Sequence, residues 1–145
     1  MKYCPLCSNE LVTTEKENKV YPACPDLSCG FIHWNNPVPV VAAIIELNDK
    51  VLLAHNVSWP EKMFGLVSGF LEEKEIPEQA IQREIKEETN LDTLEVQLVG
   101  VYPFEQMNQL IIAYHVKCSG DIALNEELDD YKLLEKSKLK PWNFG

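Results

Sequence analysis

Residues 69–91 read GFLEEKEIPEQAIQREIKEETNL, and this stretch decides which fold we predict. Pro77 suits the first position of a helix, where its missing N–H leaves no hydrogen bond unmade. Asn90 tolerates the left-handed conformation that ends many helices. Apolar residues, Ile85 among them, recur on one side of the segment between these two positions. The sequence therefore predicts an amphipathic helix over residues 77–89.

Three glutamates share one face of this helix, because Glu84, Glu87 and Glu88 are spaced i, i+3 and i+4. Their charges repel one another and lie near the negative end of the helix dipole, which costs from a few tenths to about 1 kcal/mol each. A divalent cation among the three carboxylates would offset this cost, since Mg²⁺ prefers hard oxygen ligands. The alternative is a solvated acidic face that Arg83 and Lys86 partly neutralise.

The same stretch resembles the Nudix box, G-x5-E-x7-R-E-U-x-E-E-x-G-U, in which U is an aliphatic residue. The penultimate glycine of the box is replaced here by Asn90, a mild change because both residues tolerate positive φ. The other eight fixed positions are matched by Gly69, Glu75, Arg83, Glu84, Ile85, Glu87, Glu88 and Leu91. A match of this length is highly specific.

The resemblance implies an α+β fold, the Nudix α/β/α sandwich with a mixed sheet. It also implies that Glu84, Glu87 and Glu88 ligate Mg²⁺ or Mn²⁺, which activates water against a diphosphate. Glu87 is one candidate for the general base. Glu126 and Glu127, in a later loop, are further candidates for a role at the site, and a solvated acidic turn is the alternative for both.

Three other positions of the box have supporting roles in the resemblance. Arg83 and Glu75 are expected to pair and to orient the glutamates. The backbone at Gly69 is expected to approach the metal or the phosphate, where a side chain would be in the way.

Four of the five cysteines lie within the first 29 residues, as the pairs Cys4/Cys7 and Cys24/Cys29. Two such pairs can present four thiolates to zinc in a tetrahedral arrangement. Two disulfides or four buried free cysteines are the alternatives, and a reducing compartment disfavours the disulfides. With four sulfur ligands the zinc would have no open position, so we expect a structural ion.

The remaining sequence predicts two domains, a zinc ribbon over residues 1–34 and a Nudix domain over residues 35–145. The second domain begins with an apolar run, residues 38–47, which suits a buried strand. A tight turn at residues 48–49 predicts a hairpin with residues 51–54. Further strands are expected near residue 67 and over residues 94–102 and 109–118. The tail, residues 126–140, is polar and ambiguous, and a short helix near its end is plausible.

The composition limits the functional classes. The formal net charge of −10 and the pI near 4.7 argue against general nucleic-acid binding, because no basic surface is available to neutralise phosphates. No signal peptide or membrane span is apparent, so we expect a cytoplasmic protein. The histidines His33, His55 and His115 form no metal-ligand spacing, and Cys118 is expected in the core.

A zinc ribbon followed by a Nudix domain resembles the NADH pyrophosphatase branch of the family. The branch's motif S-Q-P-W-P-F-P is only partly matched, because the corresponding residues 101–110 read VYPFEQMNQL. We therefore expect hydrolysis of NADH, ADP-ribose, FAD or a similar dinucleotide to mononucleotides. Phe70, Tyr102 and Phe104 are candidates to stack on a base, although packing roles serve equally well.

Two other functional classes are alternatives to an enzyme. One is a Nudix-fold sensor that binds a nucleotide without turnover, which the intact glutamate set disfavours. The other is a zinc-ribbon adaptor for protein or RNA. A homodimer is a possible oligomeric state.

Overall fold

The computed structural model describes residues 1–139 of the 145-residue chain. By its internal contacts the chain divides into two compact units, of which the first comprises Met1–Asn36 and the second begins at Pro37. The two units are described separately below.

The first unit is built on one antiparallel hairpin, formed by β1 (Val12–Lys16) and β2 (Lys19–Ala23). Its two-residue turn, Glu17–Asn18, has φ values of 50° and 65°, the conformation that matches the twist of paired strands. One isolated bridge, Ala23–Ile32, attaches the segment after the hairpin to β2, and another, Tyr3–Glu10, closes the segment before it.

The second unit is a six-stranded sheet with strand order β6-β7-β3-β4-β8, in which β5 also pairs with β3. The β3–β7 pair is parallel and the other pairs are antiparallel, so the sheet is mixed, as the resemblance implied. The strands are β3 (Val38–Leu47), β4 (Lys50–Asn56), β5 (Val67–Phe70), β6 (Asp92–Phe104), β7 (Gln109–Ser119) and β8 (Leu128–Glu135).

Strand β3 shares one of its edges between two partners. Its last residues pair with β4 through the predicted tight turn, in which Asn48 and Asp49 have φ values of 51° and 66°. Its first half pairs with β5, so that Val41 lies opposite Gly69. This arrangement places β5 beside β3 at the end of the sheet away from the hairpin turn.

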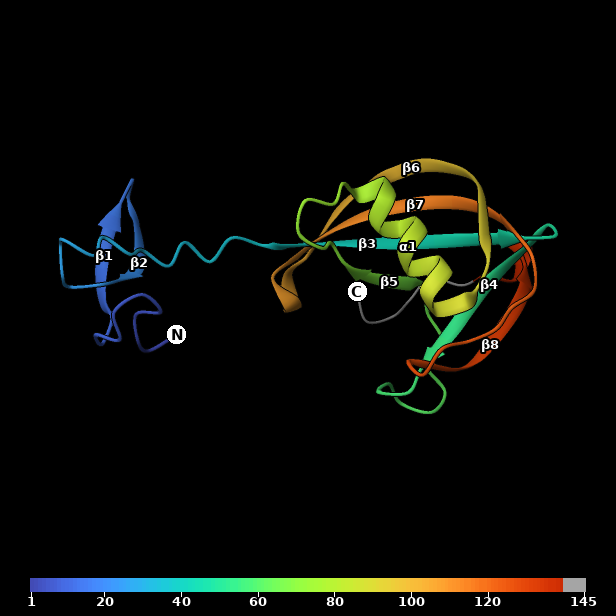
Figure 1. The fold of residues 1–145 in the computed structure, drawn as a ribbon, viewed down its shortest axis with the longest axis horizontal. Coiled ribbons are helices and arrows are strands. Elements are labelled where there is room, and N and C mark those ends of the chain that lie inside the picture. The colour runs from blue at the N-terminus through green and yellow to red at the C-terminus, as the bar shows by residue number, and fades with distance from the viewer. Residues whose placement is uncertain (140–145) are drawn as a thin grey trace. The chain divides into compact units, whose positions relative to one another are not determined.

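Helix α1 spans Pro77–Thr89, as predicted, and lies against one face of the sheet over β3, β5 and β6 (Figure 1). At its start the Ile76 N–H donates to the side-chain oxygen of Gln79 (3.2 Å). At its end Asn90 has a φ of 67°, which confirms the left-handed conformation expected there. Fully buried Ile81 and Ile85 anchor the helix in the core.

One strand of the second unit was not predicted from the sequence. The polar tail forms strand β8 and then a single 3-10 turn, η2 (Lys136–Lys138), without an α-helix there. β8 lies at the edge of the sheet and is mostly exposed, so its sequence lacks the apolar alternation that reveals a strand. Within residues 1–139 α1 is the only α-helix, and together with the mixed sheet it forms the α+β fold that the resemblance implied.

A short 3-10 turn, η1 (Glu105–Met107), connects β6 to β7. In the described part of the chain, no helix is long and apolar enough to cross a membrane.

Candidate active site and cysteine cluster

The contact between β5 and α1 leaves room for no side chain at Gly69. A Cβ atom at this position would lie 2.2 Å from the carboxyl carbon of Glu84, closer than two such atoms can approach. The glycine therefore allows the Glu84 carboxylate to lie directly against the strand. The approach of the Gly69 backbone to a metal or a phosphate, which the resemblance implies, stays a prediction.

Arg83 connects the acidic groups around this contact. Its Nε and Nη2 atoms donate to the carboxylate of Glu75 at 2.7 and 2.9 Å, the bidentate geometry of a strong ion pair. Its Nη1 atom donates to Glu84 (2.9 Å) and Glu87 (3.2 Å), and Nη2 also donates to the carbonyl of Phe70 (3.0 Å). The hydrogen bonds from Arg83 lower the pKa of Glu75 to about 2.

Glu88 is the least accessible of the three helix glutamates. Its exposed fraction is 4%, and one of its carboxyl oxygens has no hydrogen-bond partner. Burial, followed by the neighbouring carboxyls of Glu127 and Glu84, raises the pKa of Glu88 to about 9. Burial likewise raises the pKa of Glu84, although Arg83 opposes this shift. Buried carboxyls that lack a cationic partner fit a bound divalent cation, which would stabilise their charged forms.

A groove with a volume of about 430 Å³ opens beside these residues. Phe70, with 58% of its surface exposed, borders the groove, whereas Tyr102 and Phe104 on β6 are not among its described lining residues. The groove is lined by Ser68, Gly69, Phe70, Leu71, Glu72, Arg83, Glu84, Glu87 and Glu127. Of the two late glutamates considered from the sequence, Glu127 borders this groove and Glu126 does not.

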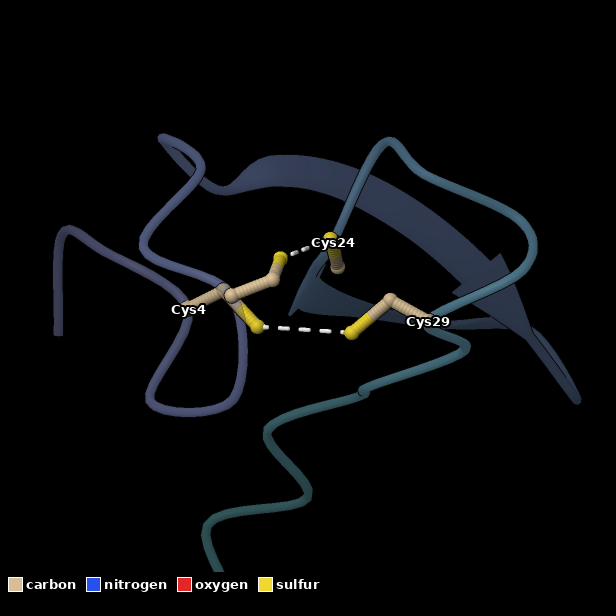
Figure 2. Close-up of side chains that lie close together, drawn as sticks. Cys4, Cys24 and Cys29 are labelled. Atoms are coloured by element: carbon tan, nitrogen blue, oxygen red, sulfur yellow. Dashed lines mark hydrogen bonds between the residues drawn. The ribbon is translucent and has the colours of Figure 1, made fainter.

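The four cysteines of the first unit form a tight cluster. Their sulfur atoms all lie within 4.8 Å of one another, and among the described residues no other group of three or more potential ligands is so close. The Cys4 and Cys29 sulfurs are 3.7 Å apart, and those of Cys7 and Cys24 are 3.4 Å apart (Figure 2). These distances exclude disulfides, whose sulfurs lie about 2.05 Å apart.

The spacing of the sulfurs fits a zinc ion. Tetrahedral Zn–S bonds of about 2.3 Å place the sulfurs about 3.8 Å apart, close to the distances observed. Burial disfavours the Cys4 thiolate, but backbone N–H groups of Leu6 and Cys7 outweigh it and lower the pKa of Cys4 to about 7. The cluster therefore has the donor set and the dimensions that a zinc site requires.

The mixed sheet, the helix that covers it and the carboxylates beside Gly69 agree with the class of protein that the Nudix resemblance implied. The NUDIX domain model matches residues 36–144, and the chain belongs to this family. A crystal structure of a NUDIX hydrolase from Nitrosomonas europaea has a TM-score of 0.82 and 30% identity, covering 99% of this chain and 82% of that one.

Curated relatives cover both units of the chain. The NAD-capped RNA hydrolase NudC of Vibrio atlanticus is 30% identical over 122 residues, which are 83% of this chain and 43% of the relative. The protein of the same name from Vibrio vulnificus is 26% identical over 97% of this chain and 53% of the relative. The chain thus spans about half the length of these curated relatives.

One neighbour of the site was not singled out from the sequence. His55 was interpreted as an ordinary histidine, yet it is buried and hydrogen-bonded to Asp129, two residues after Glu127. The partners are 74 positions apart in the chain, so no local spacing connects them. His115 forms a looser pair with Glu46, at 3.7 Å.

Proposed function

We propose that the second unit hydrolyses the pyrophosphate linkage of a nucleoside diphosphate derivative, using Mg²⁺ or Mn²⁺. Nudix enzymes as a family use a divalent metal, and Glu84, Glu87 and Glu88 would hold it here, with Glu127 as a further ligand. The observation that carries the proposal is the buried carboxyl of Glu88, which has an unpartnered oxygen beside Glu127 and Glu84. A fold that needed only solubility would not bury such a group.

The groups at the site have different roles in the proposed reaction. The cation, when bound, neutralises the diphosphate and polarises phosphorus for attack by water. Arg83, held by Glu75, orients the carboxylates of Glu84 and Glu87. Glu87 has the most accessible side chain of the three helix glutamates, with 55% exposed, and is the candidate to take the proton from the attacking water.

The substrate is proposed to be a dinucleotide such as NADH, ADP-ribose or FAD. The relatives named for NAD-capped RNA support a nicotinamide dinucleotide within this group. Phe70 is exposed at the groove and can stack on a base. Tyr102 and Phe104 stay predictions, as does the absence of general nucleic-acid binding that the net charge of −10 favours.

The first unit is proposed to hold one structural Zn²⁺ through Cys4, Cys7, Cys24 and Cys29. In the cytoplasm, the location expected from the sequence, these thiols would stay reduced and able to bind zinc. Catalysis would not involve this ion, because four sulfur ligands leave no position for water.

Turnover of a substrate panel tests the proposal. The panel comprises NADH, ADP-ribose, FAD, an oligoribonucleotide with an NAD cap and the same oligoribonucleotide with a triphosphate end, each with and without Mg²⁺. Mononucleotide release that requires the metal and is lost in Glu87→Gln is expected from the proposal. A protein that binds these nucleotides without turnover is instead a sensor. Binding of the triphosphate-ended oligoribonucleotide as tightly as the NAD-capped one would contradict the expected lack of general RNA binding.

A further inference from the structure

His55, on β4, is a buried histidine whose two ring nitrogens both face acceptors. Nδ1 contacts the carboxylate of Asp129, and Nε2 lies 3.1 Å from the carbonyl oxygen of Pro60. Both acceptors approach the same ring, so His55 contacts Asp129 and the 57–66 loop at once. The hydrogen bond to Asp129 raises the pKa of His55 against the effect of burial.

Asp129 occupies a β-bulge between β4 and β8. His55 pairs with Asp130 and Asn56 pairs with Leu128, so the ladder skips Asp129. A bulge changes the direction of nearby side chains, and bulges are common beside active sites. The skipped residue, Asp129, is the one that contacts the buried ring of His55.

The bulge directly follows Glu127, which borders the candidate metal site. The backbone of Glu127 is held on both sides, since its carbonyl accepts from Val57 N–H (3.0 Å) and its N–H donates to the side chain of Asn125 (3.0 Å). Asn125 in turn donates its N–H to the carbonyl of Glu88 (3.2 Å). The segment thus links the bulge to the end of the glutamate helix.

His55 connects two segments that meet at Glu127. Through Asp129 it holds the bulge, and through Pro60 it holds the loop 57–66, whose first residue donates to the Glu127 carbonyl. Both connections start from one side chain, which is buried.

We infer that His55 is a positioning residue for the metal site, which fixes the Glu127 carboxylate at the groove by holding Asp129 and the loop 57–66. The inference rests on the proposed function, because it takes Glu127 as a metal ligand. His55 touches neither the metal nor the substrate in this account. Partners of this kind typically change metal affinity by about 10- to 100-fold.

The dissociation constant for Mn²⁺, measured on the full chain by calorimetry or electron paramagnetic resonance, tests this inference. Asp129→Asn retains the shape of the side chain and removes the charge that faces His55, and it is expected to weaken Mn²⁺ binding about tenfold. Asp130→Asn is the matched control, because it removes an equal charge from the adjacent residue, whose carboxylate accepts from Tyr131 N–H. Equal weakening in both variants would show a general charge effect and overturn the inference.

The effect of Asp129→Asn on Mn²⁺ affinity is measured again in a chain that also carries Glu127→Gln. If His55 and Asp129 act through Glu127, Asp129→Asn has no further effect on Mn²⁺ affinity in this background. A tenfold effect that persists there, or an unchanged affinity in Glu127→Gln alone, would overturn the inference. His55→Gln provides a second variant, expected to behave as Asp129→Asn does, and the unfolding temperature of each variant verifies that it is folded.

Wild-type turnover separates this inference from the proposed function. A wild-type chain that binds Mn²⁺ without hydrolysing any member of the substrate panel would contradict the proposed function. The Mn²⁺ dissociation constants of the variants at residues 55, 129 and 127, alone and combined, would still decide whether His55 positions Glu127.

Discussion

At the scale of single residues, Arg83 determines how the acidic groups are arranged. It binds Glu75 through two hydrogen bonds and reaches Glu84 and Glu87 with its remaining nitrogen. Glu88 and Glu127 lack such a contact, and the pKa of Glu88 is raised as a result of burial and of its acidic neighbours. The site therefore combines acidic groups that have a cationic partner with acidic groups that have none among the described residues.

The Arg83–Glu75 pair predicts a specific loss of stability in acid. The folded-state pKa of Glu75 is about 2, below its ordinary value of 4.5, so the pair contributes stability above pH 4.5. That contribution is lost as the pH falls from about 4.5 to about 2. Chemical unfolding of metal-free protein across this range should show a shallower decrease for Glu75→Gln than for wild type.

Glu73→Gln is the control for the acid experiment, because its side chain is 87% exposed and is near only Lys74, at 3.9 Å. Its pH profile should follow that of the wild type. Parallel profiles for Glu75→Gln and wild type would contradict the role given to the pair.

We expect the Gly69→Ala substitution to displace the side chain of Glu84. The added Cβ would lie 2.2 Å from the Glu84 carboxyl carbon, so this side chain must move away from the site. Mn²⁺ affinity should fall at least about tenfold, since a ligand is displaced. Ser68→Ala, on the same strand, should retain wild-type affinity, and equal affinities for Gly69→Ala and wild type would show that Glu84 is not a ligand.

Residues that are neighbours in the chain could be predicted at this scale, and distant partners could not. The pairing of Arg83 with Glu75 was implied by the resemblance to the Nudix box, whose positions all lie within residues 69–91. The contact of His55 with Asp129 depends on the pairing of β4 with β8 and on a bulge, neither of which is visible in local sequence.

At the scale of elements, α1 ends directly after the turn that carries Glu87 and Glu88. Asn90 adopts a φ of 67°, and its N–H donates to the carbonyl of Lys86 (3.0 Å). The residue thus ends the helix directly after the Glu88–Thr89 turn.

Substitution of Asn90 tests this helix end. Asn90→Ala should destabilise the protein by about 1 kcal/mol, because alanine is strained at positive φ. Asn90→Gly should be close to wild type, since glycine adopts this conformation without strain. Urea unfolding measures both, and an Ala variant as stable as the Gly variant would contradict the assigned conformation.

Elements with a strong apolar pattern were predicted with nearly correct bounds, and the polar strand β8 was not. The run that forms β3 and the helix α1 both bury apolar side chains, which leaves a clear period in the sequence. Strand β8 buries only its first residue fully, so its sequence is indistinguishable from a polar loop. The parallel pairing of β3 with β7 joins segments too far apart for any local signal.

At the scale of the whole molecule, the two units differ in how they are stabilised. The second has an extended apolar core between the sheet and α1. The buried hydrophobic residues of the first are only Cys4, Ala23 and Cys24 among those described. A unit this small generally needs a metal ion or cross-links in place of a core.

Removal of zinc should therefore unfold one unit selectively. Treatment with a thiol-reactive reagent and a chelator is expected to abolish amide-exchange protection in β1 and β2, because binding of zinc supplies the folding free energy. Protection in β3 and α1 should stay unchanged. Intact protection of β1 and β2 after one equivalent of zinc is released would contradict a structural role for the ion.

The central claim is that a metal ion held by the buried end of the glutamate helix drives hydrolysis of a pyrophosphate. The rate of Mg²⁺-dependent mononucleotide release by Glu88→Gln tests it most directly, because glutamine matches the neutral form that Glu88 adopts without metal, with its pKa of about 9. The account predicts a rate at least about a hundredfold below wild type, with an unfolding temperature that is not lowered. Glu95→Gln, on the exposed surface of β6, should retain the wild-type rate. A wild-type rate in Glu88→Gln would contradict the claim.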